Sequence, residues 1–296
     1  DTENLKEVVV ELSNAKLADE EKLVDENNYR IDKFKVEKVT VDGDNVILLL
    51  DKALVKGRSY DLNIRNIDKA INGKYSFKAY DNASPKVEKV EVLGEYGIKV
   101  TVSEPVDNPR ERDFLIDGRN VAMNLDTYGR DIILTPYHKS AFPANAETLT
   151  VKSLEDFAGY KAALEDFEIE IVKDEVAPEV VDVVVKGNVV EVTFDKDIYA
   201  DSVAGYENRK DVGNISYRSG RQTIYTVEED DDTNYGTKVD TNKAEYVFED
   251  ILPRRTEVTI EGVQNHSKVT MEKVTVEARE IKDDLEPEII DVDITK

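Results

Sequence analysis

A proline followed by an alternating strand recurs three times, and this repeat limits the fold more than any other feature of the chain. After Pro85, Pro178 and Pro287, apolar and polar residues alternate over a short run. Proline has no backbone N–H for a sheet ladder and fixes φ, so it suits the start of a strand that leaves a linker. Such self-similarity predicts a row of similar modules rather than one large domain.

A second repeated pattern lies later in each module. It consists of three apolar residues with identical spacing, followed each time by a polar turn. The two patterns occur in a constant order along the chain, which makes coincidence a poor explanation. The three occurrences are Leu62, Ile64 and Ile67, then Leu149, Val151 and Leu154, then Val258, Ile260 and Val263.

The two patterns together predict the module boundaries. Residues 1–80, 81–174 and 175–283 each form one predicted module, and residues 284–296 form the first strand of a following one. The third module is longer than the second, and we assign the difference to an acidic insertion near 225–243. The first module begins with the equivalent of a second strand, so it is expected to lack its first strand. We therefore interpret the chain as part of a longer array.

Short alternating runs with turn residues between them dominate the modules. Ile98, Val100 and Val102 share one face of a predicted strand, and residues 42–45 and 186–188 carry turn chemistry between strands. Hydrophobic residues make up 40% of the chain, and 14 Tyr and 8 Phe supply material for cores. The predicted fold class is all-β, with tandem immunoglobulin-like β-sandwich domains in an elongated array.

Charge and composition exclude several functions. The 64 acidic residues exceed the 40 basic ones, for a net charge of −24. This field disfavours nucleic acid and anionic membrane, and it favours metal cations or a cationic partner. Cysteine is absent, and the two histidines, His138 and His266, fall in different predicted modules without a catalytic motif. No apolar run is long enough for a membrane helix. We therefore predict that the chain is not an enzyme.

The order of the motifs resembles the bacterial immunoglobulin-like repeats of Gram-positive surface-layer (S-layer) proteins. The residues that carry the resemblance are the strand ends VSEPV at 102–106 and FDKDI at 194–198, and LTVKSLEDFAG at 149–159. The resemblance implies an extracellular, structural role at the cell surface, with self-assembly into a two-dimensional lattice of identical neighbours. It also implies calcium that stiffens the array. Attachment to a cell-wall polymer would involve regions outside this sequence.

Two other functions fit the same modules. An adhesin or stalk would use them to space a binding domain from the cell wall. An accessory array would attach them to a secreted hydrolase, whose catalytic domain would lie elsewhere in the parent protein.

Calcium is also suggested by the residues themselves, because acidic side chains cluster at the predicted joints. Calcium takes six to eight oxygen ligands, and clustered carboxylates supply them while losing their mutual repulsion. The alternative is that acidic linkers are merely solvated. The same choice applies to the acidic run 228–232, which we interpret as a solvated loop. The candidate metal ligands are Asp81, Asn82, Glu104, Asp107, Asp174, Glu175, Asp195, Asp197, Asp283 and Asp284.

Overall fold

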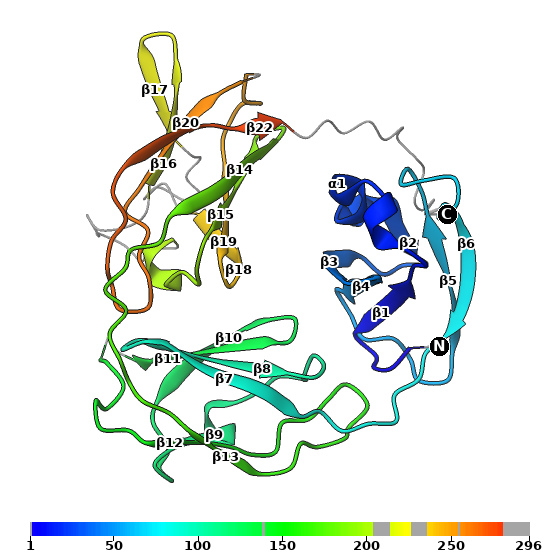
Figure 1. The fold of residues 1–296 in the computed structure, drawn as a ribbon, viewed down its shortest axis with the longest axis vertical. Helices are drawn as coiled ribbons and strands as arrows, with labels where there is room; N and C mark the ends of the chain where they lie inside the picture. Colours follow the sequence, from blue (N-terminus) through cyan, green and yellow to red (C-terminus); the bar gives the residue numbers. More distant parts are fainter. Residues whose placement is uncertain (1, 138–139, 204–213, 226–235, 254, 281–296) are drawn as a thin grey trace, which may run out of the picture. The chain divides into compact units, whose positions relative to one another are not determined.

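The computed structural model describes residues 2–137, 140–203, 214–225, 236–253 and 255–280 (Figure 1). The chain divides into two compact units, residues 1–172 and 173–296. Nearly all of the described regular structure is β-strand, so the predicted all-β class is confirmed. No helix in the described ranges is long and apolar enough to cross a membrane.

The first half of unit 1 contains two three-stranded antiparallel sheets. Its strands are β1 (Glu7–Glu11), β2 (Tyr29–Ile31), β3 (Val36–Asp42), β4 (Asn45–Leu50), β5 (Ser59–Ile64) and β6 (Gly73–Lys78). They pair in the orders β1-β4-β3 and β2-β5-β6. The helix α1 (Glu20–Leu23) and the 3-10 turns η1 (Ala15–Leu17) and η2 (Glu26–Asn28) connect β1 to β2.

The second half of unit 1 contains a four-stranded and a three-stranded antiparallel sheet. Its strands are β7 (Val87–Gly94), β8 (Gly97–Val102), β9 (Phe114–Ile116), β10 (Met123–Tyr128), β11 (Asp131–Pro136), β12 (Thr148–Val151) and β13 (Glu165–Glu168), with a 3-10 turn η3 (Glu111–Asp113) before β9. The orders are β10-β11-β8-β7 and β13-β12-β9. Relative to the first half, the strand β7 is additional, and it is the strand that follows Pro85.

Unit 2 repeats the same two-sheet plan. Its strands are β14 (Val180–Lys186), β15 (Val189–Phe194), β16 (Asn214–Ser219), β17 (Gln222–Tyr225), β18 (Gly236–Asp240), β19 (Lys243–Val247), β20 (Glu257–Glu261), β21 (Val274–Glu277) and β22 (Arg279–Glu280), with a 3-10 turn η5 (Ala200–Ser202) after β15. The orders are β18-β19-β15-β14-β22 and β17-β16-β20-β21. All pairings are antiparallel except the short parallel one between β14 and β22.

Alternation along the strands builds the cores as the sequence predicts. Ile98, Val100 and Val102 on β8 are fully buried, and the three repeated apolar triads lie in three separate clusters. Side chains from two facing sheets share each cluster, which is the packing of a β-sandwich. The predicted turns also form: Gly43 (φ 61°) joins β3 to β4, and Gly187 (φ 66°) joins β14 to β15.

The module boundaries themselves stay predictions. The three clusters lie within 5–79, 98–154 and 183–278, inside the predicted modules. Residues 226–235 of the predicted insertion, including the acidic run 228–232, lie outside the described residues. The predicted leading strand at 284–296 also lies outside them.

A matched pair of leucines in one sandwich tests this assignment of the core. Leu149 on β12 is fully buried, whereas Leu164 is 66% exposed. We expect Leu149→Ala to lower the free energy of unfolding by about 2–5 kcal/mol, because it removes buried methyl groups and leaves a cavity. Leu164→Ala is the control and should change it by less than about 0.5 kcal/mol. Chemical denaturation measures both, and equal effects would contradict the assignment.

Candidate metal centre

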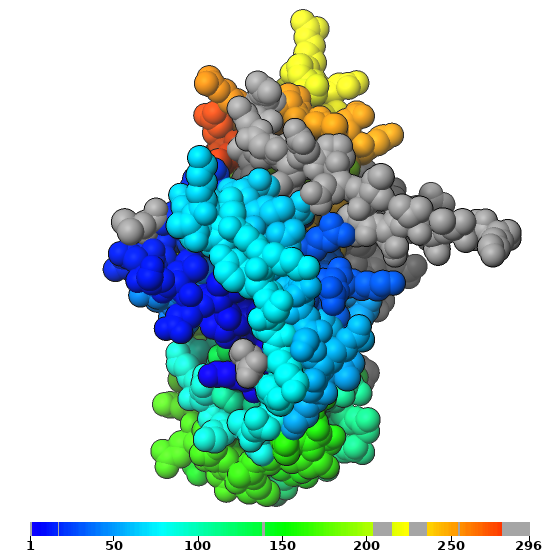
Figure 2. Space-filling view, turned by 90° about the vertical axis from the view of Figure 1, so that its right-hand side faces the viewer, coloured from blue at the N-terminus to red at the C-terminus, as the bar shows by residue number. Residues whose placement is uncertain are grey.

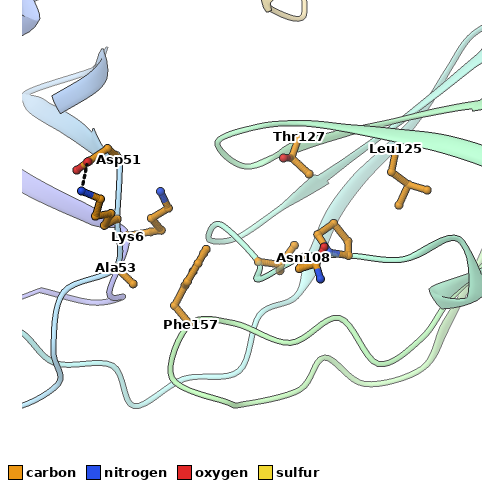
Figure 3. Close-up of a pocket in the computed structure, with 10 residues that line it drawn as sticks. Lys6, Asp51, Ala53, Asn108, Leu125, Thr127 and Phe157 are labelled. Atoms are coloured by element: carbon orange, nitrogen blue, oxygen red, sulfur yellow. Dashed lines mark ion pairs between the residues drawn. The ribbon is translucent and has the colours of Figure 1, made fainter. Parts of the chain in front are cut away.

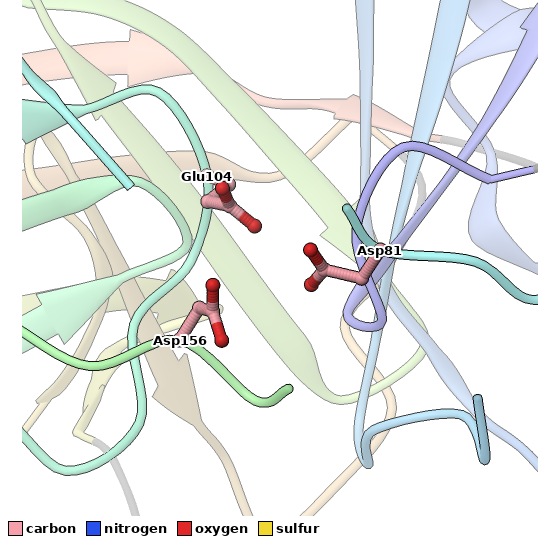
Figure 4. A group of neighbouring side chains, drawn as sticks. All are labelled: Asp81, Glu104 and Asp156. Atoms are coloured by element: carbon pink, nitrogen blue, oxygen red, sulfur yellow. The ribbon is translucent and has the colours of Figure 1, made fainter. Parts of the chain in front are cut away.

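Three carboxylates from distant parts of unit 1 meet in its interior. Asp81 belongs to the linker after β6, Glu104 follows β8, and Asp156 follows β12. One ligand oxygen from each lies within 4.8 Å of the others, and the three residues are 1%, 5% and 2% exposed. Figure 4 shows the Glu104 and Asp156 carboxylates facing Asp81. We call these three residues the acid cluster.

The acid cluster has buried carboxylate oxygens that receive no hydrogen bond from the described part of the protein. Both carboxylate oxygens of Asp81, Oε2 of Glu104 and Oδ2 of Asp156 are buried and accept no hydrogen bond from the described residues. The Ala83 N–H near Asp81 falls outside hydrogen-bond geometry. Removing a carboxylate from water without a partner costs several kcal/mol, and like charges nearby add to that cost.

The ionisation of the cluster reflects this environment. Burial raises the pKa of Glu104 to about 7, and the negative charges of Asp81 and Asp156 contribute in the same direction. Burial also raises the pKa of Asp81, with a further contribution from Asp156. Ionisation of each carboxyl group would cost less free energy if a cation lay beside it.

The loop after β12 fixes the orientation of Asp156. Its Oδ1 accepts hydrogen bonds from the N–H groups of Ala158 (2.8 Å) and Tyr160 (2.9 Å), and its own N–H donates to Tyr160 O at 2.9 Å. Gly159 supplies the left-handed conformation that closes this turn, with φ of 90°. One oxygen of Asp156 is therefore used to hold the turn, while Oδ2 remains for the cluster.

The acid cluster lies where the two sandwiches of unit 1 meet, which we call the joint. Arg130, in the turn between β10 and β11, makes a bidentate ion pair with buried Glu7 of β1 at 2.7–3.0 Å. Phe157 packs against the core of the first sandwich, beneath Lys6 Nζ at 5.5 Å from its ring centroid. The space-filling view shows the blue-to-cyan first sandwich directly against the green second one (Figure 2).

A pocket of about 350 Å³ opens at the same joint (Figure 3). Lys6, Lys52 and Asp51 line it together with Phe157, and Lys52 pairs with Asp51 at 3.2 Å. Its two lysines and single carboxylate disfavour a metal cation. The pocket is therefore distinct in chemistry from the acid cluster.

The structure brings together two of the predicted ligands at the first linker and leaves the other two apart. Asp81 and Glu104 belong to the acid cluster, whereas Asn82 and Asp107 are exposed and lie outside it. Asp107 instead donates its backbone N–H to Glu155 O at 2.7 Å. The assignment of metal ligands stays a prediction.

The predicted ligands at the second linker have other roles. Asp174 Oδ2 accepts a hydrogen bond from Lys196 Nζ at 2.8 Å, and Asp195 Oδ1 accepts one from Glu179 N at 2.7 Å. Glu175 is exposed, and Asp197 is half-buried. Within the described ranges, these four residues form no acidic cluster of the kind seen at the joint. Asp283 and Asp284 lie outside the described residues.

Asp156 was not among the predicted ligands. It stands in the polar turn after the second apolar triad, where an acidic residue is ordinary in a chain with 64 of them. Its position relative to the repeat could have identified it, because the turn carrying it directly follows the strand that ends at Val151 and approaches the linker.

Comparison with known proteins gives the same class as the sequence resemblance. No protein-family model matches the chain. The surface-layer 125 kDa protein of Lysinibacillus sphaericus is 33% identical over an alignment of 288 residues that covers 92% of this chain and 23% of that protein. The outer cell wall protein of Brevibacillus brevis is 32% identical over 181 residues, covering 60% of this chain and 18% of that protein.

A solved structure, the N-terminal part of the bacterial S-layer protein SbsC, covers 67% of this chain and 44% of its own. It is 16% identical with a TM-score of 0.28, too low to bear on the fold in detail. The fold and the two sequence relatives define a bacterial cell-surface protein built from immunoglobulin-like sandwiches. Within this class the chain is similar to S-layer proteins, as its motifs indicated. It spans less than a quarter of the length of either curated relative.

The pKa of Glu104 predicts how the stability of the metal-free chain depends on pH. The folded-state value of about 7 lies above the value of 4.5 for an unperturbed glutamate, so the folded chain retains a proton that the unfolded chain releases. The contribution of Glu104 is therefore most favourable below about pH 4.5 and is lost as pH rises to about 7, at a cost of about 3 kcal/mol.

Chemical denaturation in a chelator, at pH 5 and pH 8, measures this effect. Glu104→Gln removes the ionisation, so the variant should gain stability relative to the original chain at pH 8 and much less at pH 5. The exposed Glu165→Gln provides the control and should show no such difference. An equal effect of Glu104→Gln at both pH values would contradict the assignment of the raised pKa.

Proposed function

We propose that this chain is a non-catalytic structural segment of an S-layer protein that self-assembles with identical neighbours into a two-dimensional lattice. A calcium ion held by the acid cluster stiffens the joint in unit 1. The observation that carries this proposal is the set of buried carboxylates with unpartnered oxygens at the contact between two sandwiches. Binding of a cell-wall polymer would belong to parts of the parent protein outside this sequence.

The donor set fits a hard divalent cation. Carboxylate oxygens are the ligands that calcium prefers, and calcium–oxygen distances of about 2.3–2.6 Å allow one ion to contact oxygens about 5 Å apart. The oxygens of the acid cluster lie within 4.8 Å of one another. Asp81, Glu104 and Asp156 would hold the ion, and water would complete its coordination. The bound ion would supply the positive charge that offsets their desolvation and repulsion.

The position of the cluster explains how a bound ion would stiffen the array. Asp81 lies on the linker, whereas Glu104 and Asp156 lie on the second sandwich. An ion that binds all three fixes the linker to that sandwich, next to the Glu7–Arg130 pair that joins β1 to the β10–β11 turn. A linker held at several points has fewer accessible orientations, so the two sandwiches move less freely.

Calcium titration of the chelator-treated chain tests the site. Because an ion that binds only the folded state stabilises it by mass action, we expect about 2.7 kcal/mol of added stability at a free calcium concentration of one hundred times Kd. Asp156→Asn removes one negative charge, while its amide oxygen can still accept the two turn hydrogen bonds. This variant should weaken calcium binding at least tenfold in calorimetry.

Asp195→Asn is the matched control, since the Asp195 carboxylate also accepts a backbone hydrogen bond but lies outside the acid cluster. It should leave calcium affinity unchanged. Calcium binding that is equal in the original chain and in Asp156→Asn would contradict the assignment of the site.

Electron microscopy of an intact S-layer protein that contains this chain tests the lattice. We expect a regular two-dimensional lattice with calcium, and a less ordered one in chelator or with Asp156→Asn. A protein that forms no lattice under any of these conditions would contradict the structural role and favour the stalk or adhesin. A lattice that is indifferent to chelator would contradict the calcium role alone.

A further inference from the structure

The surroundings of the acid cluster recur in unit 2 with the same backbone hydrogen bonds. In both places the residue after the second strand bonds to the residue after the proline. The loop that follows the apolar triad also closes in the same way. Ser103 N–H donates to Lys86 O in unit 1, as Asp195 N–H donates to Glu179 O in unit 2. In the same way, Asp107 N–H to Glu155 O matches Tyr199 N–H to Gln264 O. Finally, Asp156 N–H to Tyr160 O matches Asn265 N–H to Val269 O.

These matched backbone hydrogen bonds pair each side chain of the acid cluster with one residue of unit 2. Asp81 and Asp174 each stand four residues before the repeated proline. Asn265 Oδ1 accepts from the N–H groups of Ser267 and Val269, as Asp156 Oδ1 does from its own loop, and Lys268 has positive φ (59°) at the position of Gly159. The strand ends place Lys196 at the position of Glu104.

The matched site in unit 2, which we call the lysine latch, contains Asp174, Lys196 and Asn265. Lys196 Nζ donates to Asp174 Oδ2 at 2.8 Å and to Val176 O at 2.9 Å. Asn265 Nδ2 donates to the carbonyl oxygens of Asp174 (2.9 Å) and Val176 (2.8 Å). The linker residues 174–176 are thus bound to their own sandwich by an ammonium and an amide.

The two sites differ in charge and in whether their polar atoms have hydrogen-bond partners. The acid cluster carries three carboxylates with unpartnered oxygens, whereas the lysine latch has one carboxylate, one ammonium and one neutral amide. Burial opposes ionisation of Asp174, but hydrogen bonds from Lys196 and Val176 hold its pKa below the usual value. The lysine latch therefore has no excess negative charge for a metal ion to neutralise.

We propose that Lys196 is a built-in cation whose ammonium replaces, in unit 2, the divalent ion bound by the acid cluster in unit 1. The two sites differ at two repeat positions, Glu104 against Lys196 and Asp156 against Asn265. The first of these decides whether a linker needs metal to be held against its sandwich. This inference rests on the proposed calcium role of the acid cluster. Withdrawal of calcium then releases the linker at Asp81 and leaves residues 174–176 attached.

Exchange of the two residues tests the inference in the full chain. Glu104→Lys should abolish the calcium-dependent rise in the thermal midpoint of unit 1, and should raise that midpoint by about 5 °C in chelator, because the ammonium is always present. Glu104→Gln is its control: it should also weaken the calcium response, but should raise the midpoint in chelator less than the lysine does.

Lys196→Glu makes the reverse change. It should add one calcium ion to the stoichiometry measured by calorimetry and make unit 2 sensitive to chelator. Lys196→Met is the control that removes the ammonium without adding a ligand, so it should destabilise unit 2 with and without calcium. Thermal unfolding of each variant, with and without calcium, supplies the second readout.

The outcomes separate the two proposals. A calcium response that persists in Glu104→Lys, or a Lys196→Glu variant that folds and ignores calcium, would overturn this inference and leave the calcium site intact. An original chain that binds no calcium would instead overturn the calcium role. In that case a stabilised Glu104→Lys would still support the ammonium as the group that satisfies this position.

Discussion

Unbalanced negative charge at the joint of unit 1 is the constraint on which the arrangement there depends. Asp81, Glu104 and Asp156 are as deeply buried as core residues, yet they present oxygens without partners among the described residues. A charge in such a place is tolerated only if it is neutralised by protonation or by a cation. The pKa of Glu104, raised to about 7, expresses the first solution, and a bound divalent ion would express the second.

Other contacts bring these carboxylates close together in spite of their repulsion. The bidentate Glu7–Arg130 pair joins the two sandwiches with strong, directional hydrogen bonds. Lys56 contributes a hydrogen bond to Tyr160 at 2.9 Å, and Phe157 adds apolar contact with the first core. These contacts fix the loop after β12, and that loop carries Asp156 into the cluster. Packing and ion pairing thus assemble the site, and the carboxylates bear the electrostatic cost.

The sequence predicts the fold well because the signals for it are local. Alternation along strands such as β8 and the turn residues around Gly43 and Gly187 depend on neighbours only, and all of them form as expected. The repeated apolar triads also identify the cores, since burial follows directly from the period of the pattern.

The site was only partly predictable because its geometry is not local. Asp81 and Glu104 could be named, since a linker and a strand end were expected to approach each other. Asn82 and Asp107 are exposed, whereas Asp81 and Glu104 are buried. The amino-acid composition does not predict which of these side chains points into the protein. Asp156 required knowledge of how its loop turns. At the second linker the acids around Lys196 suggested a metal site, whereas the structure places the lysine itself between the linker and its sandwich.

The difference between the acid cluster and the lysine latch has a consequence for how the chain responds to its surroundings. An ammonium on a side chain is covalently present, so its contribution to stability does not depend on any solute. A metal ion contributes RT ln(1 + [L]/Kd), which vanishes when the free ion concentration falls well below Kd. With the proposed calcium site, the chain would have one linker of constant stiffness and one whose stiffness follows the calcium outside the cell. Because only side chains at two repeat positions, Glu104 against Lys196 and Asp156 against Asn265, separate the two cases, an array of such modules would set its response to calcium joint by joint without changing its fold.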